Sequence, residues 1–412
     1  MEDIQPIESA IHKLITHIES NQYRGFDPYD ALKSPLFSLP VLRSNKTLRF
    51  ASQQLVKRLP FNIRPLLAVP KGYNPVTLGL CIQGYSYLLS YYSKTHESEN
   101  GRKGEWVNPS PLRPLTPSLP RPSKYSETIT FLINELIGLI PDGYTGACWG
   151  YDFPWEARYA SIPAYQPTVV ATGIISNALF ICHTLTGNKE AGELCVSAAD
   201  FVINDLKRTY DSDTFCFSYS PFDDQAVFNA SMKGVRILAQ AYSLSKKEDY
   251  KKLAGQSVQY VLNNQNSDGS WFYSASGKGQ WIDNYHTGYV LDCLDEYVKC
   301  THDDSVKDVL QKGYNFYRIN FFTPDGQPKF YHNRIWPVDC TAGAQSILTL
   351  CRFGDTVLAG KVAEYLINNM QSPKGGFYFR KYKNYTEKTI FMRWSNAWMF
   401  AALACLMSPD VI

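Results

Sequence analysis

The sequence of 412 residues has no Cys-x-x-Cys pair, and its ten cysteines are scattered along the chain. Pairs at that spacing mark zinc sites and redox motifs, so neither is indicated. A chain of this length buries enough surface to fold without disulfides. We therefore expect the thiols to be reduced and buried in a cytosolic protein. Six fall inside apolar helical patterns: Cys81, Cys182, Cys195, Cys293, Cys351 and Cys405.

Long apolar segments are missing as well. The most apolar stretch, residues 397–407, is shorter than the roughly 20 residues that a membrane-spanning helix needs. The first ten residues, MEDIQPIESA, are acidic and lack the apolar core of a signal peptide. We expect a cytoplasmic protein without membrane insertion.

A large excess of one charge is also absent. Lys and Arg total 41 and Asp and Glu total 38, and this balance argues against a nucleic-acid partner. Charged residues are 19% and hydrophobic residues 44%, which excludes an intrinsically disordered chain. Aromatic residues are abundant at 14%. They suit a groove that stacks on sugars and a packed helical core equally well, so both interpretations stay open.

An internal repeat is present. A short aromatic turn is followed by a helix start that carries a small hydroxyl residue, and the hydroxyl positions are Thr168, Ser231, Thr287, Thr341 and Ser395. The intervals between them are 63, 56, 54 and 54 residues. An earlier copy ends at Thr77, before a Pro-rich stretch at 108–122 that we interpret as an inserted loop. Simple N-capping is the alternative role for each hydroxyl.

Two kinds of helix alternate in this repeat. Each hydroxyl position opens an apolar helix of the kind that is buried on most faces. The intervening segments are amphipathic, at 46–58, 125–139, 190–207, 247–264, 304–321 and 355–371. We predict an all-α (α/α)6 toroid with an inner and an outer ring of helices, formed by residues 46–412 behind an N-terminal extension at 1–45. An open solenoid is the alternative.

The toroid predicts where a ligand would bind. All inner helices would begin at the same end, so their unpaired N–H groups would converge on one funnel. Such a funnel suits an anionic or hydroxyl-rich ligand.

Four segments place polar and aromatic side chains at this end. The first, residues 149–159, combines charges and aromatic rings that are costly to bury without use. A local ion cluster is the alternative for its charged residues. Its candidate residues are Trp149, Tyr151, Asp152, Trp155, Glu156 and Arg158.

The second segment, residues 270–294, contains a histidine at the opening of an inner helix. Histidine side chains exchange protons near neutral pH, which suits an acid or base. A bond from this histidine to a neighbouring helix end is the alternative. The candidates are Trp281, Asp283, Tyr285 and His286.

The third and fourth segments place arginines near the funnel, where a planar guanidinium could bind a uronate carboxylate. Surface salt bridges are the alternative. The candidates of residues 329–344 are Tyr331, His332, Arg334, Trp336 and Asp339, and those of the C-terminal repeat are Tyr378, Arg380, Arg393, Trp394 and Asn396.

Several motifs resemble those of known toroids. QNSDGSW at 265–271 resembles the Q-x-x-x-G-x-W repeat of squalene and terpene cyclases, with a degenerate copy at 371–377, and WPVDCTA at 336–342 partly resembles their acidic motif. DNYHTGYVLDCL at 283–294 is similar to the zinc-histidine helix of prenyltransferase β subunits. The Asp-x-Cys pair that those subunits need is not matched, because Asp339 and Cys340 are adjacent and come later in the chain. We expect no metal and no cofactor.

A further resemblance covers most of the chain. RGFDPYDALKSPLF at 24–37 resembles an N-terminal signature of α/α-toroid proteins from bacterial exopolysaccharide and capsule clusters. WFYSASGKGQ at 271–280 is similar to a stretch of the more distant heparosan glucuronyl 5-epimerases. The resemblance implies polysaccharide biosynthesis or modification, with an acidic poly- or oligosaccharide and other proteins of that process as partners.

These observations predict an enzyme that abstracts a proton beside a uronate carboxylate, as an epimerase or lyase does. Arg334 or Arg393 would neutralise the carboxylate, and Tyr151, Tyr285 and His286 are the acid and base candidates.

Three alternatives stay open. A glycoside hydrolase would use two of Asp152, Glu156, Asp283 and Asp339, about 5 or 6.5–9.5 Å apart. A carbohydrate-binding or scaffold protein would have an aromatic funnel without catalysis. A terpenoid cyclase would need a deep apolar cavity above Asp339.

Overall fold

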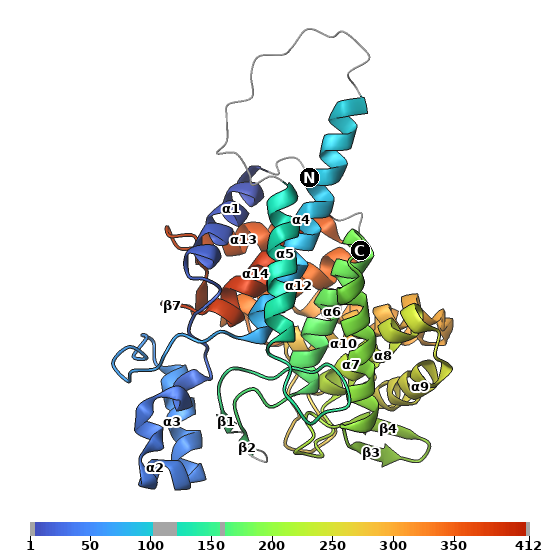
Figure 1. Ribbon diagram of the computed structural model, residues 1–412, viewed down its shortest axis with the longest axis horizontal. Coiled ribbons are helices and arrows are strands. Elements are labelled where there is room, and N and C mark those ends of the chain that lie inside the picture. Colours follow the sequence, from blue (N-terminus) through green and yellow to red (C-terminus); the bar gives the residue numbers. More distant parts are fainter. Residues whose placement is uncertain (1–4, 102–121, 157–160, 409–412) are drawn as a thin grey trace.

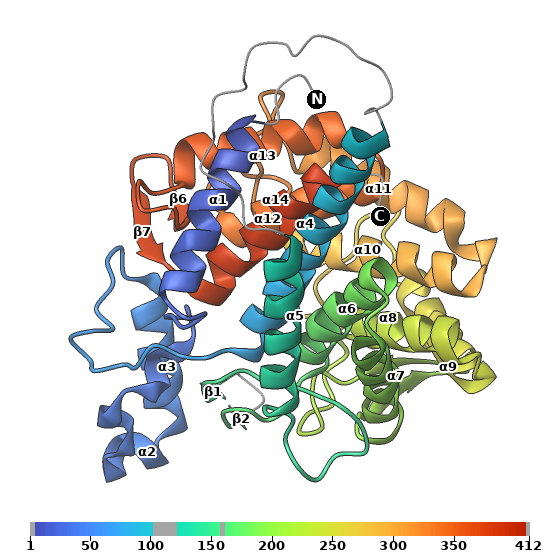
Figure 2. The ribbon, with the colours of Figure 1, turned by 45° about the horizontal axis from the view of Figure 1, so that its top comes forward.

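The computed structural model describes residues 5–101, 122–156 and 161–408. Six buried helices form an inner ring in which each packs against the next, and the last packs against the first. Figures 1 and 2 show this arrangement. The inner helices are α4 (Pro75–Gly101), α6 (Val169–Thr186), α8 (Phe228–Ser245), α10 (Asn284–Thr301), α12 (Cys340–Arg352) and α14 (Trp398–Met407). The predicted all-α toroid is confirmed, and because α14 closes on α4 the open solenoid is excluded.

Six helices cover the outside of this ring. They are amphipathic, and each buries one apolar stripe against the inner helices. They are α1 (Gln5–Ser20), α5 (Pro122–Ile137), α7 (Lys189–Asn204), α9 (Glu248–Asn263), α11 (Lys307–Asn320) and α13 (Thr356–Met370).

One outer helix differs from the prediction. The predicted helix at 46–58 exists as α3 (Lys46–Arg58), but it contacts β1 and the short helices α2 (Pro40–Ser44) and η1 (Asp30–Lys33). The outer position next to α13 and α14 is taken by α1, which buries six apolar residues where α3 buries only Gln53 and Val56. A helix that precedes residue 45 therefore packs against the ring. The division into an extension at 1–45 and a toroid at 46–412 stays a prediction.

Short strands accompany the helices near their connections. The pairs are β1 (Trp155–Glu156) with β2 (Ser161–Ile162), and β3 (Arg208–Asp211) with β4 (Thr214–Phe217). A three-stranded antiparallel sheet contains β5 (Val338–Asp339), β6 (Tyr378–Lys381) and β7 (Thr386–Ile390). Its register places Asp339 opposite Arg380.

The capping residues of the inner helices differ partly from the repeat. Thr168 caps α6, since its hydroxyl accepts a bond from the Ala171 N–H. Carboxylates are the caps of two later inner helices, with Asp283 on α10 and Asp339 on α12. Ser231 lies inside α8 and Ser395 lies in the π-helical turn η4 (Met392–Ala397). The hydroxyl repeat thus marks the first turns, while aspartate performs the capping in two of them.

All ten cysteines are buried and unpaired, as predicted, and the cytosolic location stays a prediction. Among the described helices, α6 alone is long and apolar enough to cross a membrane, and it lies in the inner ring with 67% of that window buried. Of the Pro-rich stretch at 108–122, residues up to 121 lie outside the described residues, so the inserted loop stays a prediction.

Candidate active site

A cavity of about 530 Å³ lies at the N-terminal ends of the inner helices. The first turns of α6, α8 and α10 line it, together with η4 and the aromatic turns before them. It therefore occupies the position at which the funnel was predicted. Ten predicted site residues line it: Tyr151, Trp155, Trp281, Asp283, Tyr285, His286, Tyr331, Arg380, Arg393 and Trp394.

His286 is held in one orientation by Asp283. Its Nδ1 lies 2.7 Å from Asp283 Oδ2, while Asp283 Oδ1 accepts the His286 backbone N–H at 3.0 Å as the helix cap. Trp281 Nε1 donates to the same carboxylate at 3.0 Å. A carboxylate on Nδ1 favours the tautomer with the proton there, which leaves Nε2 as an acceptor. No described residue bonds to Nε2, so this atom is available to a ligand.

Aromatic rings make up most of the remaining wall. Trp281 stacks on Tyr273 with a centroid distance of 4.4 Å and an interplanar angle of 15°. Trp155 lies against Tyr219 at 5.5 Å. Tyr285 contacts the Trp394 ring edge-on at 5.8 Å. Rings of this kind offer flat apolar faces beside polar groups, the combination that a hydroxyl-rich ring ligand needs.

The tyrosines of the cavity hold their protons strongly. Burial raises the pKa of Tyr285 well above its ordinary value, and the nearby Asp283 carboxylate adds to the effect. Burial also raises the pKa of Tyr151, although the Arg393 guanidinium 4.8 Å from its ring and a hydrogen bond with Tyr219 oppose the rise. At neutral pH these phenols are therefore proton donors rather than bases.

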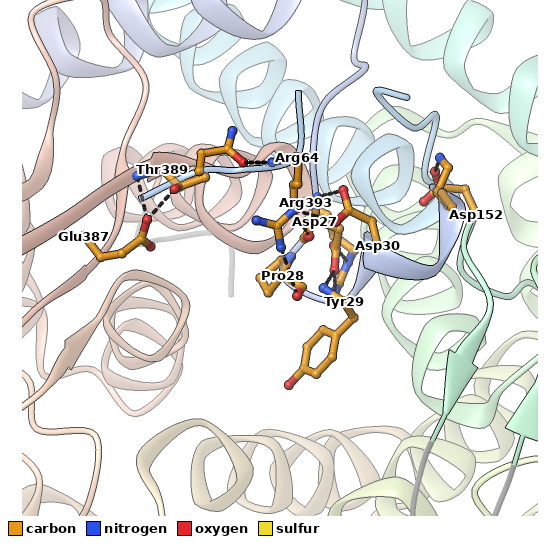
Figure 3. Close-up of polar contacts among 11 residues, drawn as sticks. Asp27, Pro28, Tyr29, Asp30, Arg64, Asp152, Glu387, Thr389 and Arg393 are labelled. Carbon is orange, nitrogen blue, oxygen red and sulfur yellow. Dashed lines mark hydrogen bonds and ion pairs between the residues drawn. The ribbon is translucent and has the colours of Figure 1, made fainter. Parts of the chain in front are cut away.

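Two cavity arginines are already paired. Arg393 donates from Nε and Nη2 to the carboxylate of Asp27 at 2.6 and 2.9 Å. Figure 3 shows this pair beside Asp30 and Arg64, which form a second buried ion pair. Arg380 Nε donates to Asp339 at 2.6 Å. Both guanidinium charges are thus neutralised by the protein itself.

The N-terminal part of the chain supplies a wall that the sequence did not predict. Tyr29 lines the cavity with three residues of α3, Gln54, Lys57 and Arg58. Lys57 Nζ contacts the Tyr29 hydroxyl. The spacing of 54, 57 and 58 places these α3 residues on one helix face, but sequence alone gives no reason for that face to meet the ring. Tyr219 and Tyr273, also in the wall, end two of the aromatic turns and were not singled out.

Three predicted residues of the first segment lie away from the cavity. Trp149 is fully buried in the core, where its Nε1 donates to the Leu136 carbonyl at 2.8 Å. Asp152 accepts from Lys33 at 2.6 Å and from Asn74 at 2.7 Å.

Glu156 accepts from Arg49 at 2.7 Å and from Ser161 at 3.0 Å. Both carboxylates of this segment thus anchor the N-terminal part of the chain. Arg158 lies outside the described residues.

Six further candidates do not line the cavity either. Asp339 is buried beneath Arg380 and Trp394, whose Nε1 is 3.3 Å from its Oδ1. Arg334 is exposed and lies 5.3 Å from the Tyr331 ring. His332 Nδ1 lies 3.4 Å from the Ile282 carbonyl oxygen, and Trp336 packs against the hydrophobic core. Tyr378 lies on β6, and the Asn396 side chain accepts a hydrogen bond from the Phe377 N–H. The catalytic role predicted for Asp339 and the binding roles predicted for the other five stay predictions.

Within the described ranges, no three side chains of His, Cys, Asp or Glu gather as metal ligands do. Asp283 is also the single carboxylate among the described residues that line the cavity. The arrangement can accordingly bind a polar ring ligand, exchange a proton through His286 and donate protons from tyrosines.

Solved structures match the fold. The chain is similar to cellobiose 2-epimerase from Bacillus thermoamylovorans, with 12% identity, a TM-score of 0.56, and coverage of 82% of this chain and 88% of that one. It is also similar to unsaturated glucuronyl hydrolase from Streptococcus agalactiae, with 10% identity, a TM-score of 0.55, and coverage of 99% and 91%. No family model and no curated protein matches this chain. At these identities the likeness establishes the α/α toroid and leaves the activity open.

Proposed function

We propose that this protein is a carbohydrate-modifying enzyme that binds an acidic poly- or oligosaccharide and exchanges a proton at the carbon beside a uronate carboxylate. The observation that carries the proposal is the pair of His286 and Asp283 at the wall of an aromatic cavity. Asp283 stabilises the imidazolium that forms when Nε2 takes a proton. Protonation of the same carbon from its other face by a second residue gives an epimerase. Loss of the sugar oxygen on the neighbouring carbon, which takes up a proton and leaves as a hydroxyl, gives a lyase.

The carboxylate partner differs from the sequence-based hypothesis. Arg334 does not line the cavity, and the charge of Arg393 is balanced by Asp27. Lys57 and Arg58 line the cavity and form no ion pair with a described residue. We assign the neutralisation of the substrate carboxylate to these two side chains of α3.

A proton donor is needed on the face of the sugar opposite the base. Tyr151 and Tyr285 are both in the cavity wall and both keep their protons at neutral pH because burial raises their pKa values. We assign the donor to Tyr151. Tyr285 is adjacent to His286 in the chain and the centroids of the two rings are 4.0 Å apart, so Tyr285 lies on the same side as the base.

The names of the similar structures support a sugar as the ligand, since they are those of a cellobiose 2-epimerase and a glucuronyl hydrolase. A hydrolase needs a pair of carboxylates, and Asp283 has no second carboxylate beside it among the described residues of the wall. The biosynthetic role, the bacterial origin and the cytoplasmic location rest on the sequence and its resemblances.

The experiment is incubation with a panel of acidic polysaccharides in heavy water, read by NMR and mass spectrometry. Deuterium beside the carboxylate is expected with the wild type, and His286→Asn should lower its incorporation by about 100-fold or more. His302→Asn is the matched control, because that imidazole is exposed at the C-terminal end of α10 and does not line the cavity.

An intact deuterated chain would indicate an epimerase, and cleavage to an unsaturated product a lyase. Cleavage with addition of water would instead favour the hydrolase. Binding without any exchange would contradict the proposal and favour a carbohydrate-binding protein.

A further inference from the structure

The segment 35–66 differs in charge from the rest of the chain. It contains six Lys or Arg residues and no Asp or Glu. The whole chain has a net charge of +3, so the remainder carries −3. We call this segment the arm; it consists of η2 (Pro35–Ser38), α2, α3 and the residues that follow to 66. Arg49 and Arg64 are paired with Glu156 and Asp30, which lie outside the segment. The other four basic residues leave the segment with a net positive charge, which attracts anionic surfaces.

The same segment also exposes apolar side chains. Seven of the seventeen large hydrophobic residues that are exposed in the described structure lie in it. Single exposed apolar residues are normal, but seven within 32 residues indicate a surface that another apolar phase covers. They are Leu36, Leu39, Val41, Leu48, Leu55, Phe61 and Leu66, with exposed fractions of 41–86%.

The inner side of the arm is fixed to the body. Arg49 forms an ion pair with Glu156 at 2.7 Å, and Gln53 accepts the Glu156 backbone N–H at 3.2 Å. In both views α2 and α3 project from one edge of the ring (Figures 1 and 2). The arm is therefore a docked element with an outward side that no described residue covers.

Exposed apolar and basic side chains occur together in the arm, although Lys46 lies about half a turn of α3 away from Leu48 and Leu55. Leu48 and Leu55 are two helical turns apart and so lie on one face of α3. Arg43 and Lys46, at the junction of α2 and α3, are exposed and form no side-chain bond with a described residue. A helix in a membrane interface typically has an apolar face that enters the acyl layer and cations off that face that bind headgroups.

We propose that the arm docks the protein onto the surface of an anionic lipid bilayer. Leu48, Leu55 and Val41 would enter the boundary between headgroups and acyl chains, and Arg43 and Lys46 would contact anionic headgroups. An acidic protein partner fits the basic charge but leaves the exposed leucines unexplained. The docking does not depend on the proposed catalysis and needs no spanning helix.

The test is flotation of the full-length protein with vesicles of phosphatidylcholine, with and without phosphatidylglycerol. We expect binding only to the vesicles that contain phosphatidylglycerol, and less binding at high salt. Arg43→Gln with Lys46→Gln should weaken partitioning by up to about 30-fold. Val41→Gln with Leu55→Gln should also abolish most of the binding.

Matched controls distinguish binding through the arm from nonspecific binding of other exposed apolar or basic residues. Ile319→Gln with Val357→Gln removes two residues that are 73% and 72% exposed on outer helices, and Lys374→Gln with Lys383→Gln removes two exposed lysines. Both pairs should bind vesicles as the wild type does. Failure to bind anionic vesicles, or equal losses in the controls, would overturn the proposal. So would self-association in light scattering that Val41→Gln with Leu55→Gln removes, because a second copy would then be the occupant.

Discussion

Arg393 binds both carboxylate oxygens of Asp27, at 2.6 and 2.9 Å, although 366 residues separate them in the chain. Each side chain is only 5% exposed, so the pair is cut off from solvent. It ties the N-terminal segment that carries Tyr29 to the turn η4 that carries Trp394. The two ends of the chain thereby form one wall of the cavity.

Removal of Asp27 should therefore be costly. Asp27→Asn leaves the buried Arg393 charge without its counterion, and we expect the free energy of unfolding to fall by about 3–5 kcal/mol. Urea denaturation measures it. The matched control is Asp304→Asn, because Asp304 pairs with Lys307 with side chains 69% and 57% exposed, and a change below about 1 kcal/mol is expected there. Equal effects of the two substitutions would contradict the structural role of Asp27.

The carboxylate of Asp283 should matter more for catalysis than for folding. Asparagine caps helices about as well as aspartate, so Asp283→Asn should keep α10 in place. It would remove the charge that stabilises a protonated His286, and turnover should fall by about 100-fold or more. Steady-state kinetics with circular dichroism as the fold check measure both. Asp355→Asn at the cap of α13, outside the cavity, should leave turnover unchanged, and full activity of Asp283→Asn would refute the role of the pair.

Trp281 should contribute to ligand binding without supporting the fold. It is 40% exposed, lines the cavity and stacks on Tyr273. Trp281→Ala should weaken glycan binding by about tenfold, as loss of a stacking aromatic does. Isothermal titration calorimetry measures it. Tyr210→Ala, which removes an aromatic residue that is 63% exposed on β3, is the control and should bind normally.

Lys233 should make stability depend on pH. Its side chain is 1% exposed on α8, with Nζ 3.6 Å from the Tyr289 ring centroid, and burial lowers its pKa to about 7. Arg236 lowers this pKa further, while Asp292 opposes the effect. Between about pH 7 and 10 the unfolded chain then holds a proton at this lysine that the folded chain lacks. Stability should rise with pH there, by about 1.4 kcal/mol per unit from this group.

The comparison is with Lys233→Met, which fills the site without a titrating group. The difference in unfolding free energy, wild type minus variant, should increase from pH 7 to pH 9 and stay flat below pH 6. Urea titrations at several pH values measure it. A difference that is independent of pH would show that the amine keeps its ordinary pKa in the folded protein.

Much of the ring was predictable because its information is local. Each inner helix is apolar on nearly every side, as in α6, and each outer helix has one apolar stripe, so the alternation is visible in the sequence. The pairing of Asp283 and His286 was accessible for the same reason. They are three residues apart at the start of one helix, and this spacing brings their side chains together.

Other parts of the site depend on partners that are far apart in sequence. Helices α1 and α3 are both amphipathic, and no local pattern decides which of them covers the ring. The sequence alone suggests that Arg380 and Arg393 could bind a ligand. In the structure they form ion pairs with Asp339 and Asp27. Asp152 and Glu156 were predicted at the funnel and instead hold Lys33 and Arg49.

The sequence by itself therefore determined the two rings, the end at which the cavity opens, and the histidine with its aspartate, because each follows from spacing within one helix or from its repetition. The tertiary structure alone decided which charges are neutralised and that Tyr29 and Lys57 complete the wall. The physical reason is that a buried charge pairs with whichever oppositely charged group the packing brings within about 3 Å. The spacing of residues along the chain does not determine that distance.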